Sequence, residues 1–339
     1  MAFFQLGIQG YSGGVIADQT LLLQDIRDGL IVYNQGQDPI IDRMSEVSIR
    51  QTIRMSQAPK KFWNSADGGN PYDARMVYRL LQTPLRDYDL SSEFTVKWLQ
   101  DALLSDVVNE VNGAMTGDAQ LMNALFFNAC LQPQTVGAIG TPYVAGFYNG
   151  ETDVPPYKNN SFGSAHYHYQ GANSTTLTYA VFRAMKQTIQ EHGYGLNAGQ
   201  LELYFSTTQI PDVMALVNSN TTILQGETPM RQAAIDRGVY LQDIMLEGVI
   251  LKVSDDVPAG YCVMLANDVK PLTKRVHVTP AYQGLQMYAE SLNENFPLAG
   301  QKFLRRVGFS VQYLGAGCAY QLVGSTTYTA PTLTQIPTN

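Results

Sequence analysis

Apolar and polar residues alternate along two stretches in the first quarter of the chain, 47–55 and 75–80. A period of two is that of a β-strand. In the first stretch one face carries the apolar positions Val47, Ile49, Ile53 and Met55. In the second, one face carries Met76, Tyr78 and Leu80, and the other carries Arg75, Val77 and Arg79. The two stretches predict the strands of a long β-hairpin.

The segment between these strands favours a turn with a wide tip. It reads SQAPKKFWNSADGGNPYDA, and Gly68, Gly69 and Pro71 supply turn chemistry. A two-stranded hairpin is only marginally stable alone in water. We therefore expect this one to lie against a neighbouring molecule.

The period changes to three or four residues after position 90, which predicts a helix. Ser91 or Ser92 can cap it, and it continues to Asn128 as one long helix or as two that break at Gly113 and Gly117. Its apolar positions are Val96, Leu99, Leu103, Val107, Val111, Leu121 and Leu125. Its polar side carries Asp101, Asp106, Glu110 and Asp118. Two interpretations of this acidic side stay open: a solvated face, or a docking surface for the basic hairpin of an adjacent copy.

The remainder of the chain mixes strand and helix patterns. Residues 131–172 predict loops with short strands, 175–192 a helix, and LELYFS a strand followed by a capped helix. Two strands, GVILKV and YCVMLAND, are joined by a turn at Asp256, Pro258 and Gly260, and alternation returns over 305–320. The last fifteen residues form an uncharged polar tail. These patterns predict an α+β fold.

Charge is scarce and unevenly placed. Charged residues make up 15% of the chain, whereas about 25% is typical, which suits a surface largely covered by partners. Residues 43–86 hold eight basic and three acidic side chains, a net charge of +5, which leaves −12 for the rest. The residues expected to make contacts between subunits are Arg50, Arg54, Lys60, Lys61, Arg75 and Arg79 on the hairpin, and Asp101, Asp106 and Glu110 on the helix. The net charge of −7 argues against nucleic-acid binding as the main task.

Three scattered cysteines predict buried thiols in a reducing compartment rather than disulfides or a zinc site. The first residues lack the basic and apolar pattern of a secretory signal, and no apolar run is long enough for a membrane helix. We expect a chain that is made inside the cell and has no membrane partner.

Two short motifs are candidates for chemistry. GYSGG, residues 10–14, has the G-x-S-x-G pattern, which exposes a nucleophilic serine where a strand enters the turn and a helix leaves it. Ser12 comes too early for a preceding sheet, so a glycine-rich arm is the favoured interpretation and a serine hydrolase the alternative. The HYH run places His166 and His168 on one side of a strand. The sequence places no third histidine or carboxylate beside them, so no metal or cofactor is predicted.

Three segments carry a resemblance to a known family. They are SSEFTVKWLQDALLSDVVNEVN with GDAQLMNALFFNA, then SDDVPAGYCVMLAND after GVILKV, and RRVGFSVQYLGAGCAYQLV near the end. With the order of the parts, they resemble the major capsid proteins of tailed bacteriophages, whose Hong Kong phage capsid fold is shared with encapsulins. The resemblance spans about residues 25–324 and is one of architecture.

The resemblance implies a division of the α+β chain into six parts. These are an N-terminal arm (1–40), an extended β-hairpin loop (41–90), the long spine helix with the first part of the peripheral domain (91–200), the axial domain (201–295), the closing strand of the peripheral domain (296–324) and a polar C-terminal tail (325–339).

The function that the resemblance implies is structural, not enzymatic. The chain would form hexamers and pentamers of an icosahedral capsid around double-stranded DNA, assemble in the host cytoplasm with scaffold, portal and decoration proteins, and remain in the virion. An encapsulin-like compartment is the alternative. Some family members cross-link neighbouring subunits through a lysine and an asparagine beside a glutamate, and the candidates here are Lys60, Lys61, Asn293, Asn295 and Glu294.

Overall fold

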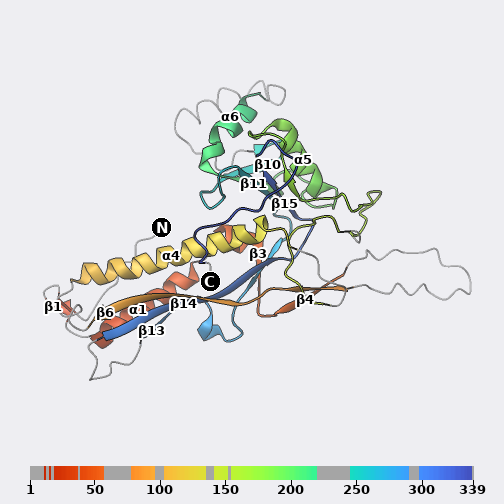
Figure 1. Cartoon of the computed structure of the whole chain (residues 1–339). Coiled ribbons are helices and arrows are strands. Elements are labelled where there is room, and N and C mark those ends of the chain that lie inside the picture. Colours follow the sequence, from red (N-terminus) through yellow and green to blue (C-terminus); the bar gives the residue numbers. More distant parts are fainter. Residues whose placement is uncertain are drawn as a thin grey trace, which may run out of the picture.

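The computed structural model describes residues 11–12, 15–16, 19–36, 39–56, 78–95, 103–134, 141–151, 154–219, 245–289 and 298–337. They form an elongated body, built on one sheet and a long helix, and a lobe built on a second sheet above it (Figure 1). Within the described part, no helix is both long and apolar enough to cross a membrane.

The body is a five-stranded sheet with two helices along it (Figure 1). Its strands run in the order β13 (Leu285–Ala289), β14 (Leu298–Val311), β12 (Leu272–Arg275) and β3 (Ser45–Ser48), and β6 (Arg86–Thr95) also pairs with β14. The helices are α1 (Gln19–Gln35) and α4 (Leu104–Leu131). Strands β6 and β14 are antiparallel, with register from Leu298 opposite Thr95 to Val307 opposite Arg86.

The predicted start of the long helix is wrong. Ser91 and Ser92 lie in strand β6, and the helix begins at Leu104. The ladder partner of β6 lies some two hundred residues further along the chain, in β14, and local periodicity cannot show it. The helix is continuous for 28 residues, without the break allowed at Gly113 and Gly117. A Cβ added at either glycine would meet nothing within 4 Å, so neither marks a close approach.

The lobe is a six-stranded sheet that carries two helices (Figure 1). Its strands run in the order β7 (Tyr169–Gly171), β15 (Gly317–Gln321), β11 (Tyr261–Ala266), β8 (Leu201–Phe205), β10 (Val249–Val253) and β9 (Met245–Leu246). The helices are α5 (Tyr179–Gln190), capped by the Thr178 hydroxyl, and α6 (Ile210–Ser219), which a short 3₁₀ turn capped by Ser206 precedes. These elements confirm the strands and helices predicted for this region.

Helix α5 belongs to the lobe, although the predicted boundary at residue 200 groups it with the spine helix. Phe182, Met185 and Ile189 are fully buried in the same apolar cluster as Leu203 of β8 and Cys318 of β15. The other predicted domain limits stay predictions.

The strand predicted over 305–320 is two strands in two sheets. Strand β14 ends at Val311 in the body, and β15 begins at Gly317 in the lobe. Between them the chain crosses from one sheet to the other, held where Val311 N donates to Ala145 O and Gln312 N to Pro271 O. Leu314 and Ala316 are buried in this crossing, so the chain stays in the core as it passes between the sheets.

The hairpin is confirmed at its base, where β4 (Thr52–Ser56) and β5 (Tyr78–Gln82) pair antiparallel. The tip, residues 57–77, lies outside the described part. The first predicted strand is divided, because β3 leaves the hairpin and pairs in parallel with β12. Val47 is in β3, whereas Ile49 follows its end.

The two ends of the chain are more firmly packed than an arm and a tail would be. In the predicted arm, Ile26 and Leu30 of α1 are buried against Val107 and Val111 of α4. Helix α2 (Pro39–Met44) lies in the arm and the start of the predicted loop, and its Arg43 forms an ion pair of 2.8 Å with Glu202 in the lobe.

The segment 325–337 of the predicted tail crosses the end of α4. Two hydrogen bonds, each 2.7 Å long, hold it there: Tyr328 Oη donates to Leu131 O, and Gln132 Nε2 donates to Pro331 O.

All three cysteines are free, buried thiols, as predicted. Cys130, near the end of α4, points into the core beneath that helix, and Cys262 and Cys318 lie in the core of the lobe. Burial raises the pKa of each thiol, which keeps them protonated.

Candidate assembly surface

A basic and partly apolar surface lies at the base of the hairpin. Arg50 and Arg54 are exposed, as predicted. Beside them, Val47 and Ile49 are 50% and 52% exposed. Among the described residues, β3 is the last strand of its sheet, so its outer edge has no strand beside it. An open edge with exposed apolar side chains is typical of a surface that pairs with another chain. The cations beside it favour an acidic partner.

Arg79, predicted to contact a neighbouring subunit, instead anchors the hairpin to its own chain. Its residue is only 6% exposed, and its guanidinium donates to Tyr143 Oη at 3.2 Å. The backbone of Tyr143 also accepts from Gln82 N at 2.7 Å and donates to Leu80 O at 3.1 Å. A signal was present in the sequence, because the apolar residue Leu81 follows Arg79 on the same face of the strand. The structure buries Leu81, together with Thr83 of that face.

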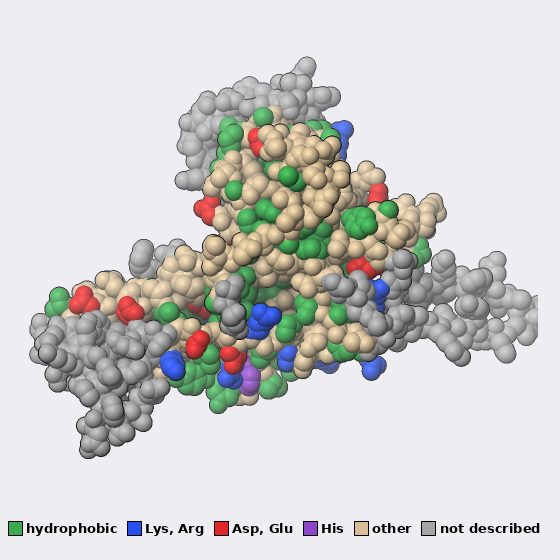
Figure 2. All heavy atoms as spheres, in the orientation of Figure 1, with side chains coloured by type: hydrophobic (Ala, Val, Ile, Leu, Met, Phe, Trp, Pro, Cys, Tyr) green, Lys and Arg blue, Asp and Glu red, His purple; other side chains and the backbone are tan. Residues whose placement is uncertain are grey.

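The acidic surface lies on the first half of α4. Asp106 and Glu110 are exposed there, and Figure 2 shows acidic side chains over this end of the helix. One carboxylate oxygen of Asp106 accepts from Leu103 N at 3.1 Å, so Asp106 also caps its own helix. This acidic surface and the basic hairpin base are at different places in the body. The basic surface of one copy can therefore contact the acidic surface of another copy.

Asp118, which the helical pattern puts on the same acidic side, is buried. It accepts from Arg305 Nε at 2.7 Å and from Tyr33 Oη at 2.9 Å, and a second guanidinium nitrogen of Arg305 also bonds to it. Burial and the Asp118 carboxylate raise the pKa of the Tyr33 hydroxyl, which therefore stays protonated and donates. This cluster joins α1, α4 and β14 inside one subunit.

The other predicted contact residues, Lys60, Lys61, Arg75 and Asp101, lie outside the described part of the chain. The same holds for Asn293, Glu294 and Asn295 of the predicted cross-link. Their roles stay predictions.

Ser12 does not lie at a nucleophile elbow. It is in strand β1 (Tyr11–Ser12), which pairs with β2 (Val15–Ile16) in a ribbon of two strands. The helix α1 expected after the motif is present, but within the described part of the chain Ser12 belongs to this ribbon and not to a larger sheet. The hydrolase alternative therefore has no structural support.

The histidines of the HYH run are joined by a third. His192, which follows α5, brings its Nε2 atom to 2.7 Å from that of His166 and 3.0 Å from that of His168, and the latter two are 3.1 Å apart. The expectation that no third histidine lies nearby is wrong, because His192 is separated from the run by the whole of α5. Among the described residues, these three are the group of side chains placed to hold a metal ion.

Comparison with solved structures supports the fold. No protein-family model and no curated protein sequence matches the chain. A structure from Mycobacterium phage Patience aligns with a TM-score of 0.66 and 21% identity over 96% of this chain and 93% of that one. The capsid of a native GTA particle aligns with a TM-score of 0.54 and 12% identity over 83% and 89%, and the capsid of cyanophage P-SCSP1u with 0.53 and 10% over 84% and 88%. The chain therefore has the α+β fold of the tailed-phage major capsid proteins.

Proposed function

We propose that the chain is the structural subunit of a viral capsid, which assembles into hexamers and pentamers of a closed icosahedral shell around double-stranded DNA. The likeness in fold to a phage protein over almost the whole chain, 96%, is the observation that carries this proposal. A structural role also fits the place of Ser12 in a two-stranded ribbon.

The distribution of exposed charge supports assembly through repeated contacts. Arg50 and Arg54 are exposed at the hairpin base, and Asp106 and Glu110 are exposed on α4. Docking of the basic surface of one copy on the acidic surface of the next generates a ring when the rotation closes. Each exposed ion pair contributes only about 0–1 kcal/mol, but a shell repeats the contact many times.

The remaining expectations follow from the same proposal. The net charge of −7 suits a subunit that encloses DNA without binding it tightly. Assembly in the host cytoplasm, residence in the virion, and contacts with scaffold, portal and decoration proteins are part of the proposed role.

Electron microscopy of the purified full-length chain, with its mass from light scattering, tests the proposal directly. We expect closed shells, or rings of five or six copies. A monomer or dimer under all salt and crowding conditions would contradict a shell-forming role. Mass spectrometry of material inside the shells separates a capsid from an encapsulin-like compartment, because the latter would retain a specific protein cargo.

Charge reversal tests the docking surfaces. In Arg50→Glu/Arg54→Glu, we expect a folded monomer that does not assemble, with the strongest loss at low salt, where screening is weakest. Arg79 stays unchanged, because its burial would confound the result. Lys158→Glu is the control, since Lys158 is exposed in the loop before the HYH run and should tolerate reversal. Normal shells from the double variant would refute the docking contact.

A further inference from the structure

Three imidazole nitrogens converge at the base of the lobe in a geometry close to that of a metal site. The Nε2 atoms of His166, His168 and His192 are 2.7–3.1 Å apart. In a tetrahedral zinc site with Zn–N distances of 2.0–2.1 Å, two ligand nitrogens lie about 3.3 Å apart. The triangle is slightly tighter than that of an occupied site, so a small outward movement of the rings admits an ion.

Hydrogen bonds alone do not satisfy this cluster. His168 Nδ1 lies 2.6 Å from Gly317 O, and a carbonyl oxygen only accepts, so the proton of neutral His168 is on Nδ1 and its Nε2 carries a lone pair. If His166 and His192 both donate to that lone pair, their own N–H groups oppose each other at 2.7 Å. If only one donates, two lone pairs are left in contact. A cation among the three nitrogens removes this conflict.

The surroundings of the three rings hold them in place, as the groups around metal ligands do in metal proteins. The hydrogen bond from His168 Nδ1 to the carbonyl at the start of β15 sets both tautomer and orientation. The ring of His192 stacks on Phe162 and Tyr148, with centroids 4.2 Å and 5.1 Å away. A Cβ added at Gly315 would lie 2.7 Å from His192 Cγ, which shows how closely the crossing between the sheets packs on this ring.

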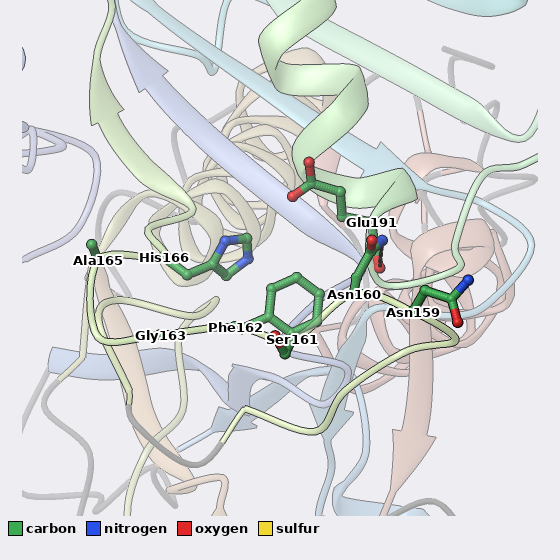
Figure 3. A pocket seen from close by; sticks show the side chains of 8 residues that line it. All are labelled: Asn159, Asn160, Ser161, Phe162, Gly163, Ala165, His166 and Glu191. Carbon is green, nitrogen blue, oxygen red and sulfur yellow. Dashed lines mark hydrogen bonds between the residues drawn. The ribbon is translucent and has the colours of Figure 1, made fainter.

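An access path from solvent also suits a metal. His166 lines an open pocket of about 500 Å³ together with Phe162, Asn160 and Glu191 (Figure 3). This pocket gives an ion a path from solvent, and the Glu191 carboxylate adds negative charge beside it.

We propose that His166, His168 and His192 bind one divalent transition-metal ion, Zn²⁺, through their Nε2 atoms. Imidazole ligands suit zinc, and three of them leave a fourth position for water. The ion would tie the end of α5 to the loop that leads into β7 and, through Gly317, to β15. Tyr148, which stacks on His192, also packs with Leu81 of the hairpin base and Leu314 of the crossing, so the ion would stiffen the place where hairpin, body and lobe meet.

Metal titration of the full-length chain tests this proposal. The chain is purified on a tag without histidines, stripped with a chelator, and titrated with Zn²⁺ by calorimetry, with the metal content measured by elemental analysis. We expect about one Zn²⁺ per chain, a rise in melting temperature on binding, and, with Co²⁺ as a probe, the intense visible absorption of tetrahedral coordination. Each signal should be lost in His166→Ala and His192→Ala.

His277→Ala is the matched control, because His277 is the one histidine outside the cluster and should leave binding unchanged. His168→Ala is avoided, since His168 is fully buried and its loss threatens folding. His166 is half-buried, and circular dichroism of its variant confirms that it is folded. Failure of the wild-type chain to bind Zn²⁺, or undiminished binding in folded His166→Ala, would overturn the proposal.

Discussion

The two halves of helix α4 differ in what surrounds them. In the first half, Val107 and Val111 are buried against α1, while Asp106 and Glu110 are exposed. In the second half, Phe126, Phe127 and Leu131 are almost completely buried, because this half lies in the core between the body and the lobe (Figure 1). One element is thus half surface and half core. Whether a half of this helix is buried or exposed to a partner subunit therefore depends on which distant segments of the chain pack on it, and not on the helix alone.

The largest expected effect is in the second half. Phe126 is 0% exposed and packs edge-to-face on Phe127 and Phe309, with centroids 5.2 Å and 6.1 Å away. We expect Phe126→Ala to lower the free energy of unfolding by about 3–5 kcal/mol, through lost burial and a cavity. Denaturant unfolding measures this loss. Val107→Ala removes fewer atoms from a buried site in the first half and should cost less. An equal cost for the two substitutions would contradict this ranking.

The second largest loss of stability is expected where the two halves of α4 meet, at Asp118. Asp118→Asn leaves the Arg305 guanidinium buried without its carboxylate, and we expect a loss of about 3 kcal/mol. The double variant Asp118→Leu/Arg305→Met removes both charges and should recover much of that loss. Denaturant unfolding of Asp118→Leu, Arg305→Met and the double variant measures the coupling. If the loss of unfolding free energy in the double variant equalled the sum of the two single losses, Asp118 and Arg305 would not be energetically coupled.

The smallest effect belongs to the exposed first turn. In Asp106→Ala the Leu103 N–H loses its acceptor and the helix N-terminus its negative charge, so we expect a cost of about 0.5–1 kcal/mol. Asp106→Asn keeps an acceptor and should cost less. Thermal unfolding of the two variants measures the difference. A cost near that of Phe126→Ala would place Asp106 in the core and not on the proposed assembly surface.

Sequence patterns were sufficient to predict those helices and strands whose own residues show a clear helical or strand period. Local periodicity predicted helix α5, strand β8 and the hairpin base, and the cap expected after LELYF is provided by Ser206. The patterns failed where a distant partner overrides them. Strand β6 exists because β14 supplies a ten-residue ladder, and its Ser91 and Ser92 otherwise resemble helix caps.

The candidate site residues divide in the same way, into those that local patterns place correctly and those that a distant partner buries. Arg50, Arg54, Asp106 and Glu110 are exposed as their faces predicted. Arg79 and Asp118 were assigned to exposed faces, but each is buried by a partner far away in sequence, Tyr143 or Arg305. The histidine cluster escaped prediction for a related reason, because His192 reaches His166 only after α5 has returned along the sheet.

The long separation in sequence between α4 and β14 has a consequence for biosynthesis. The second half of α4 leaves the ribosome well before β14, which supplies Phe309 as a neighbour of Phe126. Until β14 has been made, the apolar side chains of this half of the helix are exposed and are an aggregation hazard. The nascent chain is therefore a candidate client for chaperones during this interval.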